Sequence, residues 1–219
     1  MHKSIVNLIE IQKEIYLKKK DSGKQPKIIA VTKTFSLENI LPLIDHGHLD
    51  FGENKVQEAI DKWTKIKAEN KNLNLHMIGK LQTNKVKFAV KIFDYIHSLD
   101  SIKLARKISE EQKKIQKNIK LFIQINIGKE KQKSGILIED LKNFYMLCSK
   151  EFNLNIIGLM CLPPNDEKTE EYFIKMKQLN EKYKLEQLSM GMSNDYKLAI
   201  KNGSTFLRIG SKIFGNRIK

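Results

Sequence analysis

Eight short β-like runs alternate with amphipathic helical stretches from Lys27 onward, and this alternation constrains the fold more strongly than any other feature of the chain. A strand followed by a helix and a further strand is typical of parallel sheets, because the helix carries the chain back across the sheet. The predicted strands are KIIAVTK ending at Lys33, LDFGEN ending near Asn54, LHMIG ending at Gly79, DYIHSL ending at Leu99, LFIQINI ending at Ile127, NIIGLM ending at Met160, LEQLSMG ending at Gly191 and TFLRIG ending at Gly210. Eight such units predict an α/β fold that closes into a (β/α)8 TIM barrel.

An open doubly wound sheet is the alternative fold for this pattern. The chain has no G-x-G-x-x-G fingerprint after its first predicted strand, which disfavours that alternative. A leading helix is expected before the barrel, from Ser4 to Lys20, where Gly23 and Pro26 then end the helical pattern. Its predicted buried face carries Ile5, Leu8, Ile9, Ile15 and Tyr16. Ser101 is predicted to begin a later helix.

The 219 residues are expected to form a single domain spanning residues 1–219, because barrels of this length commonly share one core and no linker divides the chain. The formal net charge of +15 raises nucleic acid as a partner. This charge is almost entirely lysine on predicted helix faces, with only three arginines, and no RNA-reading aromatic motif accompanies it. We therefore expect no specific nucleic-acid partner.

Apolar stretches are short throughout the sequence. The longest runs, such as Leu121 to Ile127, fall far short of a membrane span, and the amino terminus carries no signal-peptide pattern. A cytoplasmic location with no membrane partner is therefore the expectation. The two cysteines, Cys148 and Cys161, have no metal-ligand spacing, so no metal site is predicted and both are expected to be reduced core residues.

Candidate functional residues lie at the predicted carboxyl ends of the strands, where the active face of such a barrel is built. Lys33 closes the first apolar strand in the segment AVTKT. An ammonium group moved out of water loses hydration, and a lowered pKa relieves this cost and leaves a nucleophilic amine. Such an amine can form a Schiff base with an aldehyde, which is how proteins usually attach pyridoxal 5'-phosphate (PLP). A lysine that merely extends from the barrel rim into water is the simpler alternative.

Two further strand ends suit an anion. The segments LSMGMSND and RIGSKIFG supply small residues, hydroxyls and backbone N–H groups, and such barrels often bind phosphate after strands seven and eight. Ser193 is expected to cap the next helix and to donate its hydroxyl to a phosphate, while Gly210 and Ser211 supply backbone N–H groups. An ordinary N-cap followed by a tight turn is the alternative interpretation.

Arg208 lies between Leu207 and Ile209 in the last predicted strand, in a chain that uses lysine for nearly all of its positive charge. Its planar guanidinium could hydrogen-bond a pyridine nitrogen, and its permanent charge would leave that nitrogen largely unprotonated. An internal ion pair that seals the barrel is the alternative role for this arginine.

Several motifs occur in a recognisable order, namely AVTKT, FGENKVQEA, HMIGKLQTNK, IQINIGKEKQKSGI, GLMCLP, LSMGMSND and GSTFLRIGSKIFGNR. Together, from about Ile29 to Arg217, they closely resemble the YggS/PROSC family of pyridoxal phosphate homeostasis proteins. The resemblance implies a barrel like the amino-terminal domain of fold type III alanine racemases. The site residues that it implies are Lys33 for a Schiff base with PLP, Asn54 beside the cofactor, Ser193, Gly210 and Ser211 on the phosphate, and Arg208 near the ring nitrogen.

The resemblance further implies a protein that takes part in PLP homeostasis by buffering and delivering the cofactor, with apo PLP-dependent enzymes as partners and without an established catalytic turnover. Alanine racemases complete their site with a second β domain and a tyrosine from it, whereas this sequence ends soon after its eighth predicted strand. We therefore expect a monomeric carrier with no catalytic residue. A PLP-dependent amino-acid racemase or lyase is the alternative, and it would need a second acid–base group, for which His76 is the candidate.

Lys133 lies in the segment KEKQKSG after the fifth predicted strand. We hypothesise that it provides a second amine at the rim of the barrel for transfer of the cofactor. A plain surface charge is the alternative interpretation of this lysine.

Overall fold

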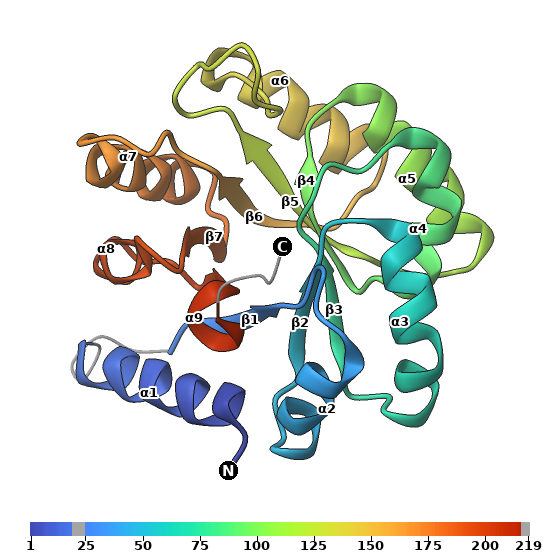
Figure 1. Ribbon diagram of the computed structural model, residues 1–219. Coiled ribbons are helices and arrows are strands. Elements are labelled where there is room, and N and C mark those ends of the chain that lie inside the picture. Colours follow the sequence, from blue (N-terminus) through green and yellow to red (C-terminus); the bar gives the residue numbers. More distant parts are fainter. Residues whose placement is uncertain (19–24, 216–219) are drawn as a thin grey trace.

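The computed structural model describes residues 1–18 and 25–215 and shows a closed parallel barrel of eight strands surrounded by helices (Figure 1). The strands follow chain order around the barrel, and β1 pairs with β8 to close it. Their bounds are β1 Lys27–Val31, β2 Asp50–Glu53, β3 Asn74–Met77, β4 Tyr95–Leu99, β5 Lys120–Ile125, β6 Ile156–Cys161, β7 Gln187–Met192 and β8 Phe206–Ile209. The (β/α)8 fold predicted from the alternation of strands and helices is confirmed.

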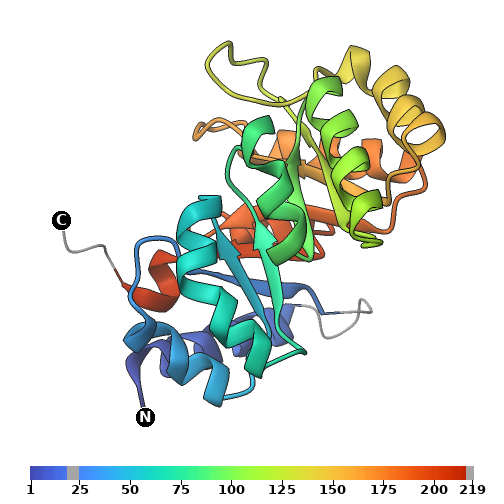
Figure 2. The same cartoon turned by 90° about the vertical axis from the view of Figure 1, so that its right-hand side faces the viewer.

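Helices cover the outside of the barrel, and both views place α1 and α2 on the opposite side from α5 and α6 (Figure 2). Their bounds are α1 Lys3–Lys18, α2 Leu37–Asp45, α3 Val56–Glu69, α4 Val86–Ile92, α5 Ile102–Lys114, α6 Leu141–Met146, α7 Thr169–Lys182, α8 Tyr196–Lys201 and α9 Ser211–Phe214. A π-helical turn, Leu147–Glu151, extends α6, and 3₁₀ turns span Thr83–Lys85 and Ile138–Asp140. As predicted, Ser101 begins α5, and its Oγ accepts a hydrogen bond from the Leu104 N–H. No helix in the described ranges is long and apolar enough to cross a membrane.

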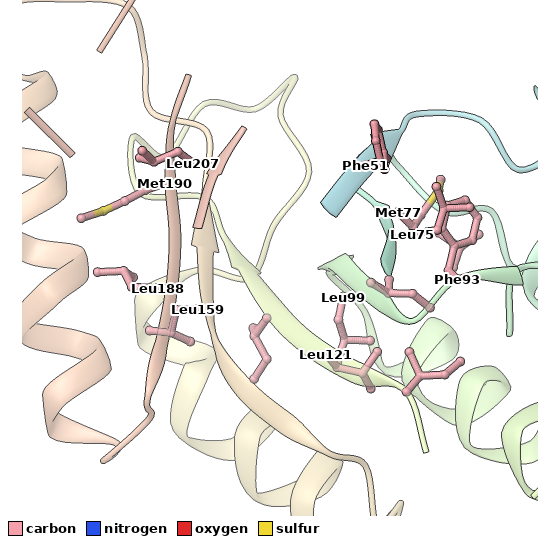
Figure 3. Packing of buried hydrophobic residues seen from close by; sticks show 14 of the residues in the cluster. Phe51, Leu75, Met77, Phe93, Leu99, Leu121, Leu159, Leu188, Met190 and Leu207 are labelled. Carbon is pink, nitrogen blue, oxygen red and sulfur yellow. The ribbon is translucent and has the colours of Figure 1, made fainter. Parts of the chain in front are cut away.

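The alternation of side chains along the strands produces two apolar clusters. The larger cluster lies between the strands and the helices, and Figure 3 shows Leu188 and Met190 extending from β7 toward a neighbouring helix. The smaller cluster fills the inside of the barrel and consists of Ile29, Tyr95, Phe122, Met160 and Phe206. Because both faces of each strand are buried, the strands read as nearly continuous apolar runs. A polar residue between two outward-facing apolar residues, such as Ser189 between Leu188 and Met190 in β7, therefore points into the barrel.

All eight strands end within two residues of the predicted positions. β1 ends at Val31 rather than Lys33, because Thr34 adopts a left-handed φ of 68° that turns the chain out of the sheet. β2, β3, β5 and β8 end one or two residues early, β6 and β7 end one residue late, and β4 ends as predicted. Apart from Arg208, which lies within β8, the predicted site residues therefore lie in the first turns after the strands, at the carboxyl-terminal mouth of the barrel.

The leading helix is confirmed as α1, but the prediction of its buried face is partly wrong. Its buried residues are Ser4, Leu8, Ile11 and Ile15. Tyr16 is 58% exposed and Ile9 is half-buried, because α1 packs against α2, α8 and α9 along a narrower stripe than the sequence suggests. The described part of the helix ends at Lys18, and the predicted end at Lys20 lies outside the described residues.

Candidate functional site

The carboxyl ends of the strands surround a cavity of about 650 Å³. Its lining includes all six residues predicted to bind a cofactor, namely Lys33, Asn54, Ser193, Arg208, Gly210 and Ser211. These residues come from β8 and from the segments that follow β1, β2, β7 and β8. The barrel therefore brings an early and a late part of the sequence together at one cavity. Apolar side chains of residues such as Phe35, Ile78 and Met192 complete the wall.

Lys33 lies two residues beyond the end of β1 and is half-buried, and the backbone on both sides of it is held in place. Before it, the Thr32 hydroxyl donates to Glu53 Oε1 over 2.7 Å. After it, the Thr34 N–H donates to Glu58 Oε1 over 2.6 Å. A lysine carried by such a braced turn presents its amine from a fixed position, which is a requirement for a reactive group.

A buried ion pair supports this turn from the side of α3. Glu53 is fully buried, and its Oε1 accepts hydrogen bonds from Lys62 Nζ over 2.9 Å and from Trp63 Nε1 over 3.0 Å. Lys62 Nζ also donates to the Thr32 carbonyl over 2.9 Å and pairs with Glu58 over 3.1 Å. Because a buried carboxylate is tolerated only when it is paired and hydrogen-bonded, this cluster fixes the turn to α3.

Asn54 follows β2 and packs closely against Gly79, which follows β3. A Cβ atom at position 79 would lie 2.4 Å from the Asn54 carbonyl oxygen and 2.7 Å from its Cα. Only glycine allows this approach without moving the neighbouring backbone. Gly79 therefore sets the position from which Asn54 enters the cavity.

Two turns meet where β7 and β8 lead into α8 and α9. Ser193 Oγ accepts a hydrogen bond from the Lys212 N–H over 3.4 Å, which joins the turn after β7 to the first residues of α9. Gly210 is the N-cap residue of α9. The N–H of Ser211, the first residue of α9, has no acceptor within that helix. Hydroxyl and N–H donors are thus gathered at one edge of the cavity.

The prediction that Ser193 caps the next helix is wrong. Asp195 occupies the N-cap position of α8, and its carboxylate accepts a hydrogen bond from the Met192 N–H. The turn after β7 is closed by a bond from the Asp195 N–H to the Met192 carbonyl, so the helix begins two residues later than a Ser193 cap would require. This arrangement leaves Ser193 on the cavity wall.

Arg208 is the third residue of β8 and is only 4% exposed. Its Nη1 donates to Ser189 Oγ over 2.7 Å, and its Nη2 donates to the Cys161 carbonyl over 2.8 Å. Burial lowers the pKa of Arg208, but a guanidinium stays charged at neutral pH. The internal ion pair considered for Arg208 is not found among the residues that the structure describes.

Two further candidate residues occupy different surroundings. His76 does not line the cavity; it is fully buried inside the barrel and hydrogen-bonded at both ring nitrogens, so it has the features of a satisfied core histidine. Lys133 Nζ donates to the Pro163 carbonyl over 3.1 Å and pairs with Glu130. Because Pro163 lines the cavity, the Lys133 amine lies at its rim.

Both cysteines are buried and free, and burial raises the pKa of each thiol to about 12. Their thiols are therefore not poised to react. Within residues 1–18 and 25–215, no group of three or more histidine, cysteine and acidic side chains could hold a metal ion.

Glu53 and Asp195 were not predicted from the sequence. Glu53 ends β2 in FGEN, and Asp195 follows the end of β7 by three residues in MSND, so an acid at or just after a strand end was a usable signal. Lys62 was also missed, and no local signal marks it, because only the packing of α3 brings it to Glu53.

The sequence matches the family described as alanine racemase, N-terminal domain, over residues 6–217. A pyridoxal phosphate homeostasis protein of Haemophilus influenzae is 35% identical over 97% of this chain and 94% of its own length. The structure of PipY from Synechococcus elongatus with PLP bound is 30% identical, with a TM-score of 0.85 over 97% of this chain and 100% of PipY. An alanine racemase of Clostridium difficile, 14% identical with a TM-score of 0.75 over 99% of this chain and 56% of its own, shares the fold. This chain therefore belongs to the alanine racemase N-terminal domain family and, within it, to the pyridoxal phosphate homeostasis proteins.

Proposed function

We propose that this protein binds PLP in the cavity at the carboxyl-terminal mouth of the barrel and holds it as a Schiff base on Lys33. The observation that carries the proposal is the meeting of three kinds of group in one cavity of about 650 Å³: an amine, a set of anion-binding donors and a buried arginine. When bound, PLP supplies an aldehyde that condenses reversibly with amines and a ring that withdraws electrons. The PLP bound to PipY supports this assignment by relationship.

Ser193, Gly210 and Ser211 are proposed to hold the phosphate. Ser193 Oγ already accepts the Lys212 N–H, so its own hydrogen can be donated to an anion. The N–H groups at the beginning of α9 add donors of the kind that bind phosphate at helix starts. The turn after β7 and the beginning of α9 thus offer a hydroxyl and N–H groups to an anion in the cavity.

Arg208 is proposed to face the ring nitrogen. Its two printed bonds, to Ser189 and to the Cys161 carbonyl, fix the plane of the guanidinium at the cavity wall. A guanidinium has only donors, so it bonds to a nitrogen that carries no proton. An unprotonated ring withdraws electrons less strongly, which suits holding PLP better than catalytic turnover.

The ionisable groups of the cavity favour a carrier over an enzyme. Among the described lining residues, only Lys33, Asp195 and Arg208 are ionisable, and the Asp195 carboxylate is engaged by the Met192 N–H. A racemase needs acid–base groups on both faces of its substrate, and His76 does not reach the cavity. We therefore propose that the protein buffers PLP and delivers it to apo PLP-dependent enzymes, and an amino-acid racemase or lyase is the second candidate.

Titration of the protein with PLP tests the binding site. Wild type should develop an imine absorbance band that saturates at one equivalent, and Lys33→Ala should lose it. Lys27→Ala, which removes a lysine from the other end of the same strand, should keep it. A band that survives in Lys33→Ala would overturn the proposed attachment.

Transfer and racemisation assays separate the two candidate functions. The loaded protein should restore activity to an apo PLP-dependent enzyme and should form no D-alanine from L-alanine. Racemisation that disappears in Lys33→Ala would instead favour the enzyme. Lys133→Ala should slow transfer if its rim amine takes part, with the exposed Lys131→Ala as control; an unchanged rate would remove that hypothesis.

A further inference from the structure

A line of buried hydrogen bonds runs through the inside of the barrel from Arg208 to Asp50, the first residue of β2. Arg208 Nη1 donates to Ser189 Oγ over 2.7 Å, and Ser189 Oγ lies 2.9 Å from His97 Nδ1. His97 Nε2 lies 3.0 Å from His76 Nδ1, and His76 Nε2 lies 3.0 Å from Asp50 Oδ1. We call Ser189, His97 and His76, the three residues between the charged ends, the interior relay.

With neutral rings, the Asp50 end of this line fixes the direction of every bond in it. An ionised carboxylate has only acceptors, so Asp50 receives its hydrogen from His76 Nε2, which leaves Nδ1 of the neutral His76 ring as an acceptor. His97 Nε2 must then donate to His76, so His97 Nδ1 accepts the hydroxyl hydrogen of Ser189. The Arg208 end is compatible with this direction, because a guanidinium has only donors and Ser189 Oγ can accept from it while donating to His97.

The surroundings of the relay exclude other partners. Ser189, His76 and His97 are all fully buried. The His76 ring stacks on Tyr95 with centroids 4.3 Å apart, and the His97 ring stacks on Phe122 at 4.2 Å. Burial lowers the pKa of both histidines, which agrees with neutral rings. In such a low-dielectric interior, hydrogen bonds polarise one another, and a polar group with no partner is costly.

The charges at the two ends explain what the relay does. Arg208 carries a buried positive charge. Within the described part of the chain no acidic side chain forms an ion pair with it, and Asp195 acts on it only at longer range. Each bond of the relay points its positive end toward Asp50 and its negative end toward Arg208. The aligned dipoles thus offset part of the cost of burying the guanidinium.

We propose that the interior relay consists of positioning residues that couple Arg208 to Asp50 as its remote counter-charge, and so fix the guanidinium in the wall of the cofactor cavity. The inference rests on the proposed function only for the identity of the ligand that Arg208 meets. It extends the cofactor site across the barrel to a carboxylate at the opposite end, which lines a different cavity.

Nuclear magnetic resonance of the PLP-free protein tests the relay without any ligand. With ¹⁵N-labelled histidine, His76 and His97 should both be neutral at pH 7 with hydrogen on Nε2. Exchange of the Arg208 guanidinium hydrogens with water should become at least about tenfold faster in Ser189→Ala, because an anchoring bond to a charged group is lost. A charged ring, hydrogen on Nδ1 of either ring, or unchanged exchange would overturn the proposal.

Loading with PLP then tests the consequence for the site. Ser189→Ala should raise the dissociation constant for PLP about tenfold and shift its absorbance maximum, and Asp50→Asn, which keeps an acceptor for His76, should raise it about threefold. Ser98→Ala is the matched control, because Ser98 is equally buried in β4 but its hydroxyl has no hydrogen-bond partner. Equal affinity in all three variants would overturn the proposal. If wild type binds no PLP while the resonance results hold, the proposed function fails and the relay stands.

Discussion

The two ends of the barrel each carry a cavity, and the two differ in what they collect. The cavity at the amino-terminal end is larger, at about 860 Å³ against about 650 Å³, and its wall combines apolar side chains of α1 with polar and charged side chains such as Lys27 and Asp50, which begin β1 and β2. The smaller cavity, at the carboxyl-terminal mouth, gathers an amine, hydroxyls, backbone donors and an arginine from four segments distant in sequence. The convergence of strand ends, not the volume, therefore distinguishes the candidate site.

The two ends also differ in how their ionic groups are held. At the mouth, the Glu53–Lys62 pair is almost completely buried, with side chains 0% and 10% exposed. At the other end, Asp94 precedes β4 and pairs with Lys67, with side chains 29% and 18% exposed. The stability of the protein should therefore depend more on the ion pair at the mouth than on the more exposed pair at the other end.

Removing a partner from the buried pair should have the largest effect. Lys62→Met leaves Glu53 buried without its counter-charge, so we expect the free energy of unfolding to fall by about 3–5 kcal/mol. Lys67→Met, the matched change at the opposite end, should cost only about 1 kcal/mol, because the Asp94 carboxylate keeps contact with water. Urea denaturation followed by circular dichroism measures both. Equal losses would contradict the contrast between the two ends.

A methyl group at Gly79 should have the next largest effect. Gly79→Ala places a Cβ against the Asn54 backbone, and we expect a loss of about 2–3 kcal/mol together with weaker PLP binding. Gly47→Ala is the control, because position 47 has a φ of 89° but open space around it, so only backbone strain of about 1 kcal/mol applies. If Gly79→Ala were the milder change, the close approach at the mouth would not matter.

The pH dependence of stability should report the histidines between the two ends. Burial lowers the pKa of His76 and His97 below the ordinary value of 6.5, so the unfolded chain binds more protons than the folded one at mildly acidic pH. The free energy of unfolding should therefore fall as pH drops below 6.5, by up to about 1.4 kcal/mol per pH unit for each histidine. His97→Gln should reduce this slope, and His46→Gln, at an exposed position, should not. A flat profile from pH 7 to 5 would contradict neutral buried rings.

The residues at the mouth were predictable because topology alone places them. Parallel strands in a closed barrel present all their carboxyl ends at one edge, so Lys33, Ser193 and Gly210 could be grouped without knowing any contact. The resemblance to a known family placed Asn54 beside the cofactor and favoured the ring nitrogen over an internal ion pair as the partner of Arg208. Strand ends were misplaced by one or two residues, as at β1, where the turn at Thr34 takes the chain out of the sheet before the predicted end.

The support behind the site was not predictable from sequence. Ser189, His97 and His76 lie on three strands, and only the register of the closed sheet brings their side chains into one line. Likewise, the contact between Glu53 and Lys62 depends on how α3 packs on the barrel. Such contacts depend on packing, which no local pattern records.

Borohydride reduction of the PLP-loaded protein, followed by peptide mapping, tests the central claim most directly. Reduction makes an imine permanent, so the modified lysine identifies the end of the barrel that holds the cofactor. We predict one pyridoxyl group per chain, on Lys33 at the mouth. A pyridoxyl group on Lys27 at the opposite end, or label spread over many surface lysines, would contradict the account.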